Sequence, residues 1–126
     1  MSNYPDNMNW ARYDATIGSV GTTAERVWEI EAEQLNDIAK RAYHEFPLNS
    51  TQRRQMIGDA MDKAQSRITC HVSLSSKEKV GLLRCYYGVM AADSADQSPQ
   101  SVSEQIGDWM HIFYLAIERQ QREGIL

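Results

Sequence analysis

Hydrophobic residues recur every three or four positions in four segments of the chain, the spacing that places them on one side of an α-helix. The second segment has the most regular stripe, formed by Met56, Ile57, Ala60, Met61, Ala64 and Ile68. The fourth has a bulkier stripe, formed by Val102, Ile106, Trp109, Met110, Phe113, Ala116 and Ile117. These stripes predict amphipathic helices that share a common core.

Residues that favour helix ends bound these segments. The sequences TTAE (22–25) and SSKE (75–78) have the spacing of a capping box, in which the first side chain and the glutamate each accept a hydrogen bond from the other's backbone N–H. Pro47 disfavours helix in the residue before it, and Gly124 is suited to follow a helix end. The predicted helices span about 22–46, 50–69, 76–92 and 99–123.

The short connections between the helices predict an all-α fold, a single-domain bundle of four main helices within residues 1–126. Residues 92–101, ADSADQSPQS, have the composition of a connection between two helices. The first 21 residues leave two alternatives. Trp10, Tyr13 and Ile17 have the spacing of a short helix, and an N-terminal arm that docks its aromatic residues fits as well.

The first predicted helix contains an acidic stretch, VWEIEAEQLND. A turn of about 100° per residue places Glu29, Glu33 and Asp37 opposite the apolar stripe. Such a charged side is typical of a helix face that meets only water. Ile30 lies on the same side, where it would supply the apolar centre of a binding surface. The predicted partner-binding residues are therefore Glu29, Ile30, Glu33 and Asp37, with a purely solvated face as the alternative.

Glu31 is expected to point into the apolar side of the same helix. An unpaired buried carboxylate is costly, so a basic partner on another helix is the favoured interpretation. Arg53, Arg67 and Lys79 lean toward the apolar sides of their own helices and are the candidate partners. A position at the rim of the core and a functional acid are the alternatives.

The third predicted helix is apolar on two sides. One side carries large residues, namely Val80, Leu83, Tyr86, Tyr87 and Met90. The opposite side carries small residues, namely Gly81, Cys85, Gly88 and Ala92. Glycine in a helix interior costs about 1 kcal/mol relative to alanine, so this small side indicates that another backbone comes close. It is predicted to be either a packing face of a central helix or a subunit interface in a homodimer, with Cys85 as a packed hydrophobe.

The overall composition narrows the classes of function. A chain of 126 residues can bury a core without a disulfide or a metal, and its two cysteines do not form a CxxC pair. The net charge of −4 disfavours nucleic-acid binding, which relies on a basic surface. No apolar run approaches the roughly 20 residues of a membrane helix, and the N-terminus lacks the blocks of a signal peptide. A reduced, cytoplasmic protein with no membrane association is expected.

No arrangement of residues predicts catalysis or a cofactor. The one Asp-x-x-His pair, Asp108 and His111, lies away from the apolar stripe of the fourth helix, and no glycine-rich phosphate loop is present. The predicted function is therefore non-catalytic binding of another protein, as a regulator, inhibitor or adaptor such as an accessory protein of a phage or other mobile element. The alternatives are a metal-dependent all-α hydrolase that uses acidic helix residues, and a nucleic-acid-binding regulator.

Overall fold

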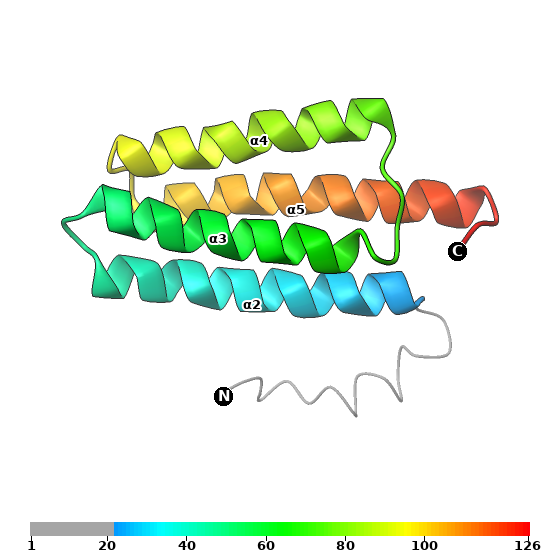
Figure 1. Cartoon of the computed structure of the whole chain (residues 1–126), viewed down its shortest axis with the longest axis horizontal. Helices are drawn as coiled ribbons and strands as arrows, with labels where there is room; N and C mark the ends of the chain where they lie inside the picture. Colours follow the sequence, from blue (N-terminus) through cyan, green and yellow to red (C-terminus); the bar gives the residue numbers. More distant parts are fainter. Residues whose placement is uncertain (1–21) are drawn as a thin grey trace.

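A computed structural model describes residues 22–126 as four α-helices, namely α2 (Thr23–Glu45), α3 (Ser50–Ile68), α4 (Ser76–Ser94) and α5 (Pro99–Arg122). The helices run alternately in opposite directions, so the α2–α3 and α4–α5 turns lie at the same end (Figure 1). The predicted all-α four-helix bundle is confirmed, with helix ends within two residues of those predicted. The prediction of an N-terminal arm or short helix falls on residues 1–21, outside the described residues.

The four helices close a ring around one core. Helix α2 packs against α3 and α5, and α4 packs against α5 and α3. The contact between α3 and α4 is the smallest of the four. The bulkiest apolar side chains at the centre come from every helix, and they include Leu35, Ile57, Met61, Val89, Trp109 and Phe113. None of the helices within residues 22–126 is both long and apolar enough to cross a membrane.

Both predicted capping boxes are present. Thr22 Oγ1 accepts a hydrogen bond from the Glu25 backbone N–H at 3.1 Å, and Glu25 Oε1 accepts one from the Thr22 N–H at 2.8 Å. Ser75 and Glu78 make the same exchange at the start of α4, over 3.1 and 2.8 Å. Each exchange satisfies backbone donors that have no partner inside the helix, which fixes where α2 and α4 begin.

The predicted partner for Glu31 is found on α3. The side chain of Glu31 is buried, and Arg67 Nη1 donates to its Oε1 at 3.1 Å. Arg67 itself is 56% exposed, so the pair lies at the edge of the core. The favoured interpretation of Glu31 as a structural pair is confirmed, with Arg67 as the partner among the three candidates.

Arg53, another of those candidates, has a different partner. Its guanidinium is 1% exposed, and Nε donates to the fully buried Asp93 at 2.6 Å. Nη2 donates to Asp96 at 2.6 Å, where the backbone turns through a positive φ of 52° between α4 and α5. Because Arg53 lies on α3 and both aspartates lie at the end of α4, this buried ion pair joins two helices that otherwise touch little.

The same guanidinium also holds the turn between α2 and α3. Nη1 of Arg53 donates to the carbonyl oxygens of Phe46 and Pro47 at 3.0 and 3.2 Å. The ring of Tyr43 lies 4.3 Å from the guanidinium carbon, within the range of a cation–π contact. The hydroxyl of Tyr43 donates to the Gln97 carbonyl at 3.3 Å. One arginine therefore connects both turns at this end of the bundle.

The small side of α4 packs against α5. A Cβ atom added to Gly81 would lie 3.1 Å from Ile112 Cδ1, and one added to Gly88 would lie 2.8 Å from Gln105 Oε1. Ala92 is buried in the core. This face is thus a packing face within the chain, as one of the two predictions held. Gly81, Cys85 and Gly88 nevertheless remain partly exposed, so the alternative of a subunit interface through these residues stays a prediction.

Cys85 belongs to this packed side of α4. Its side chain is half-buried against the core. Burial raises the pKa of the thiol, and the nearby carboxylate of Asp108 raises it further. A thiol held in its protonated form is a poor nucleophile, which agrees with the prediction that Cys85 serves packing.

Glu78 ties the start of α4 to α5 and gives the stability of the fold a dependence on pH. Arg119 Nε and Nη2 donate to its two carboxylate oxygens at 2.9 and 3.0 Å. These hydrogen bonds are the main reason why the pKa of Glu78 lies below its usual value of 4.5. The stabilisation is therefore present above that usual pKa and is lost as the pH falls through the lower pKa of the folded state.

We expect Glu78→Gln to lower the melting temperature most at neutral pH and least in acid. Glutamine can still accept from the Ser75 N–H, so the change tests the charge on Glu78 separately from the cap. The measurement is a series of thermal melts from about pH 7 to about pH 3, the range over which the carboxylate takes up its proton. Glu45→Gln, at an exposed residue, is the control. A difference between Glu78→Gln and wild type that stays constant with pH would contradict the expectation.

Candidate protein-binding face and its neighbouring pocket

Part of the large side of α4 faces away from both α5 and α3 and is exposed. Val80, Leu83 and Tyr87 are 54, 56 and 63% exposed, respectively. Their spacing of three and four residues places them in one line along the helix. We call these three residues the α4 strip. The other exposed large hydrophobic residues within 22–126 are scattered over the α2–α3 turn, α5 and the chain end, and they are Leu48, Leu115, Ile125 and Leu126.

The large residues of α4 do not all share this exposure. Tyr86 and Met90 are half-buried against the core on the side facing α3. Gly58 on α3 makes room for them, since a Cβ atom there would lie 3.0 Å from Tyr86 Oη and 3.8 Å from Met90 Cε. The five large residues are therefore divided between a packed group and the exposed α4 strip.

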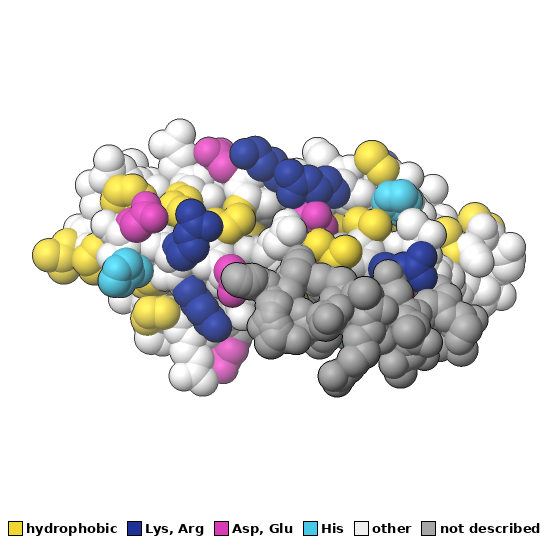
Figure 2. Space-filling model, turned by 90° about the horizontal axis from the view of Figure 1, so that it is seen from below, with side chains coloured by type: hydrophobic (Ala, Val, Ile, Leu, Met, Phe, Trp, Pro, Cys, Tyr) yellow, Lys and Arg dark blue, Asp and Glu magenta, His cyan; other side chains and the backbone are white. Residues whose placement is uncertain are grey.

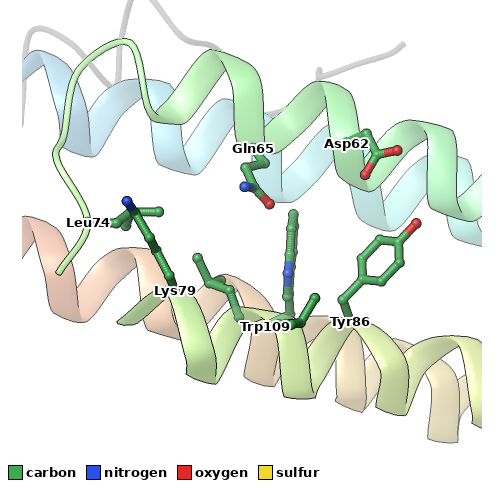
Figure 3. Close-up of a pocket in the computed structure, with 8 residues that line it drawn as sticks. Asp62, Gln65, Leu74, Lys79, Tyr86 and Trp109 are labelled. Carbon is green, nitrogen blue, oxygen red and sulfur yellow. The ribbon is translucent and has the colours of Figure 1, made fainter. Parts of the chain in front are cut away.

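A pocket of about 250 Å³ lies between α3 and α4, beside the α4 strip. Figure 3 shows the ring of Trp109 standing between the two helices, with Gln65 facing it from α3. The pocket is lined by Asp62 and Gln65 of α3, Leu74 of the connection, Lys79, Leu82, Leu83 and Tyr86 of α4, and Trp109 of α5. Leu83 belongs to both the pocket and the α4 strip, so the two features are continuous.

The polar groups of the pocket are separated along its length. Lys79 lies near Leu74 at one end, and Asp62 and the hydroxyl of Tyr86 lie together at the other (Figure 3). The pKa of the Tyr86 hydroxyl is raised, first by burial and then by the charges of Asp62 and Asp59. The hydroxyl is therefore protonated at neutral pH and available as a donor.

The acidic residues of α2 do not form the open stripe that was predicted. Asp37 is exposed as expected, but Glu29 and Glu33 are half-buried. Both line a hollow between α2 and α5, next to Trp28, whose Nε1 donates to the Met110 carbonyl at 2.8 Å. Burial raises the pKa of Glu29, and the neighbouring Glu33 raises it further. A helix that packs on two neighbours buries a wider arc than its apolar stripe alone indicates.

Ile30, the predicted apolar centre of the α2 surface, is also half-buried. Figure 2 shows the molecule from below, where acidic side chains outside the grey region are scattered singly among basic and hydrophobic ones. The described side chains that are visible in this view form no continuous acidic patch. The assignment of partner binding to Glu29, Ile30, Glu33 and Asp37 stays a prediction.

The residues considered for metal chemistry lie apart from one another or at the surface. Among residues 22–126, no three or more His, Cys, Asp and Glu side chains are placed to hold a metal ion together. Asp108 and His111 are exposed on α5, and the His111 ring stacks on Tyr114 with 6.2 Å between centroids. This contact gives His111 a packing partner on its own helix.

Comparisons of the chain with protein-family models, curated proteins and solved structures found no match. The α4 strip and the α3/α4 pocket are the features from which a function can be inferred. The sequence pattern had separated the two sides of α4, and it had predicted either close packing or a subunit interface for the small side but no binding role for the large side. The signal that could have identified the α4 strip is the pair of glycines on the small side. Glycines inside a helix indicate that a neighbour packs closely against them, so the opposite side of the helix is the one expected to be exposed.

Proposed function

We propose that this protein binds another protein through the α4 strip and acts without catalysis. The observation that carries the proposal is the alignment of Val80, Leu83 and Tyr87, each more than half exposed, on a single helix. Contiguous apolar side chains of this kind mark interaction sites, because exposing them to water is unfavourable. An amphipathic helix of a partner fits such a line of residues, since its own apolar side repeats at the same spacing.

The charges beside the strip indicate what kind of partner fits. The helix turn places Lys77 and Arg84 along one side of the strip and Lys79 along the other, and all three are exposed. The one glutamate at this end of α4, Glu78, is occupied by Arg119. The strip is therefore flanked by basic residues in a protein whose net charge is −4. A partner helix with an apolar side and acidic flanks would match both features.

The test measures how two pairs of substitutions in this protein change its binding to a protein captured from the native cell. Leu83→Ser with Tyr87→Ser removes the apolar strip, and Leu48→Ser with Leu115→Ser removes two exposed hydrophobic residues that lie elsewhere. We expect the first pair to weaken binding of the captured protein at least about tenfold, as loss of interface anchors does. Its melting temperature should match that of the control pair, since substitutions at exposed sites change stability by only about 0.5 kcal/mol.

A third pair tests the surface on α2. Ile30→Asp and Asp37→Lys alter the predicted α2 residues without touching α4. If these variants lose the partner while the α4 variants keep it, binding belongs to α2 and the assignment to the α4 strip fails. If the α4 variants alone lose it, and addition of salt weakens the wild-type complex, the basic flanks contribute as proposed.

A further inference from the structure

The seam between α2 and α5 contains two adjoining hollows, with volumes of about 500 and 490 Å³. Both hollows are lined by Asn36 and Ser103, so together they form one groove, which follows α2 from Trp28 to Ala39. We call it the α2/α5 groove. A rise of about 1.5 Å per residue makes the distance from Trp28 to Ala39 about 16 Å. An elongated groove between two helices suits a segment of polypeptide better than a compact ligand.

The half of the groove next to Trp28 has apolar walls, formed by Trp28, Ala32, Ile106 and Met110. Trp28 and Ala32 are only half-buried, so part of their apolar surface meets water. The indole Nε1 of Trp28 already donates to the Met110 carbonyl at 2.8 Å, and the rest of the ring is apolar. Apolar side chains of an occupant would therefore be stabilised by covering these walls.

The polar residues of the groove place no demand on the charge of an occupant. Ser103 Oγ donates to Asn36 Oδ1 at 3.0 Å, so these two side chains satisfy each other. Glu29 and Glu33 lie on the α2 wall, and neither is without a partner. The polar residues of the far half are exposed to water, namely Lys40, Gln100 and Glu104. What the groove offers an occupant is thus mainly apolar contact.

The described part of the chain begins at the edge of this same seam. Thr22 caps α2, and its Oγ1 lies 3.4 Å from Nε2 of Gln121 on α5. Residues 1–21 therefore join the bundle between α2 and α5. The α4 strip is farther from this point, because α4 packs on α3 and α5 and lies across the bundle from α2.

Residues 1–21 contain apolar side chains that can reach the groove. Trp10, Tyr13 and Ile17 have the spacing that places them on one side of a helix. The middle of the groove, at Ala32, lies ten helical residues from Thr22, or about 15 Å. An extended chain spans about 3.3 Å per residue, so all three side chains are within that distance of Thr22. Attachment to the same chain gives them an effective concentration on the order of millimolar, an advantage over any separate partner.

We propose that Trp10, Tyr13 and Ile17 bind in the α2/α5 groove of their own chain. The proposal concerns where these side chains bind and holds for a short helix and for an extended arm alike. It implies that the α2 surface beside Glu29 and Glu33 is used within the chain. The α4 strip, on the helix across the bundle, then remains the apolar face that is available to another protein.

The first experiment compares amide resonances of ¹⁵N-labelled full-length protein before and after Trp10→Leu. The substitution removes an aromatic ring, which shifts resonances near it, and keeps an apolar side chain in its place. We expect the amides of the groove residues on α2 and α5 to shift and those of the α4 strip to stay unchanged. Tyr4→Leu removes an aromatic ring of the same segment outside the group of three, and it should leave the groove resonances unchanged.

The second experiment measures the coupling between the segment and the groove by thermal melts. Trp10→Ser with Tyr13→Ser should lower the melting temperature by on the order of 5 °C, because apolar contacts are lost, whereas Tyr4→Ser should not. Ala32→Lys places a charge in the groove. It should lower the melting temperature of the wild type and have much less effect in the Trp10/Tyr13 variant, where the contact is already lost.

Four results would overturn the proposal. Groove resonances that ignore Trp10→Leu would show that the ring binds elsewhere, and shifts at the α4 strip would show that it covers that strip instead. Shifts that disappear on dilution would assign the groove to the segment of a second copy. Equal effects of Ala32→Lys in both backgrounds would show that the segment and the groove are not coupled. None of these results depends on whether a protein partner binds the α4 strip.

Discussion

Replacement of Arg53 by alanine is expected to lower the free energy of unfolding by about 3–5 kcal/mol, the range for loss of one member of a buried ion pair. Arg53 is 1% exposed and Asp93 is fully buried, so the carboxylate would lose its guanidinium without access to water. The carbonyls of Phe46 and Pro47 would lose a donor in the same step. Urea denaturation followed by circular dichroism measures the change.

Arg54→Ala is the matched control for this prediction. Arg54 is the next residue along α3, and its guanidinium donates to the exposed hydroxyl of Ser94 at 2.6 Å. Its loss should change stability by only about 0.5 kcal/mol, as for most surface positions. Equal effects of Arg53→Ala and Arg54→Ala would show that the buried pair contributes little. Arg53→Met combined with Asp93→Leu should recover the part of the loss due to the unpaired carboxylate, since apolar residues often replace a buried pair at little cost, while the Phe46 and Pro47 carbonyls still lack their donor.

Gly88→Leu should have the second largest effect, after Arg53→Ala, and should lower the free energy of unfolding by roughly 1–3 kcal/mol through overpacking. A Cβ atom at this position would already lie 2.8 Å from Gln105 Oε1, and leucine would carry three further carbons into the contact between α4 and α5. Gly88→Ala should be much milder, because the end of the Gln105 side chain can move aside. Thermal melts give the ranking, and sedimentation velocity gives the mass of each variant.

Gly107→Ala supplies the opposite control on the neighbouring helix. No atom lies within 4 Å of a Cβ atom added there, so alanine should gain helix propensity and stabilise the fold by up to about 1 kcal/mol. The expected result is that Gly88→Leu destabilises the protein without changing its mass. If instead a dimer dissociates and the helical spectrum is retained, the small side of α4 contacts a second subunit in solution.

Local sequence signals were sufficient for the helices and their ends. Periodicity of the apolar residues needs only the geometry of one helix, and a capping box needs only residues three positions apart. The direction of Glu31 followed from the same helix geometry, and so did the need for a base beside it. Each of these inferences depends on atoms within a few turns of one another, which is why the sequence contains enough information for them.

The partners of the buried charges were decided by the tertiary structure. Helix geometry places both Arg53 and Arg67 near the apolar side of α3, and the sequence offered no way to choose between them as the partner of Glu31. The fold places Asp93, forty positions away along the chain, against Arg53. Which base meets which acid depends on the order in which the helices surround the core and on where each turn lies, and neither is a local property.

The surfaces proposed for binding were also decided by packing between helices. Helix α4 is apolar on two sides, so its own pattern allows either side to face the core. Packing of α5 side chains against Gly81 and Gly88 turns the small side toward α5, and the α4 strip is left exposed. The pocket requires Trp109 of α5 to stand between α3 and α4, the two neighbouring helices with the smallest contact. The sequence by itself determined four helices and their apolar sides. Which side of each helix meets a neighbour, and the pocket between α3 and α4, were decided only by the packing of the helices, because both depend on atoms that are far apart along the chain.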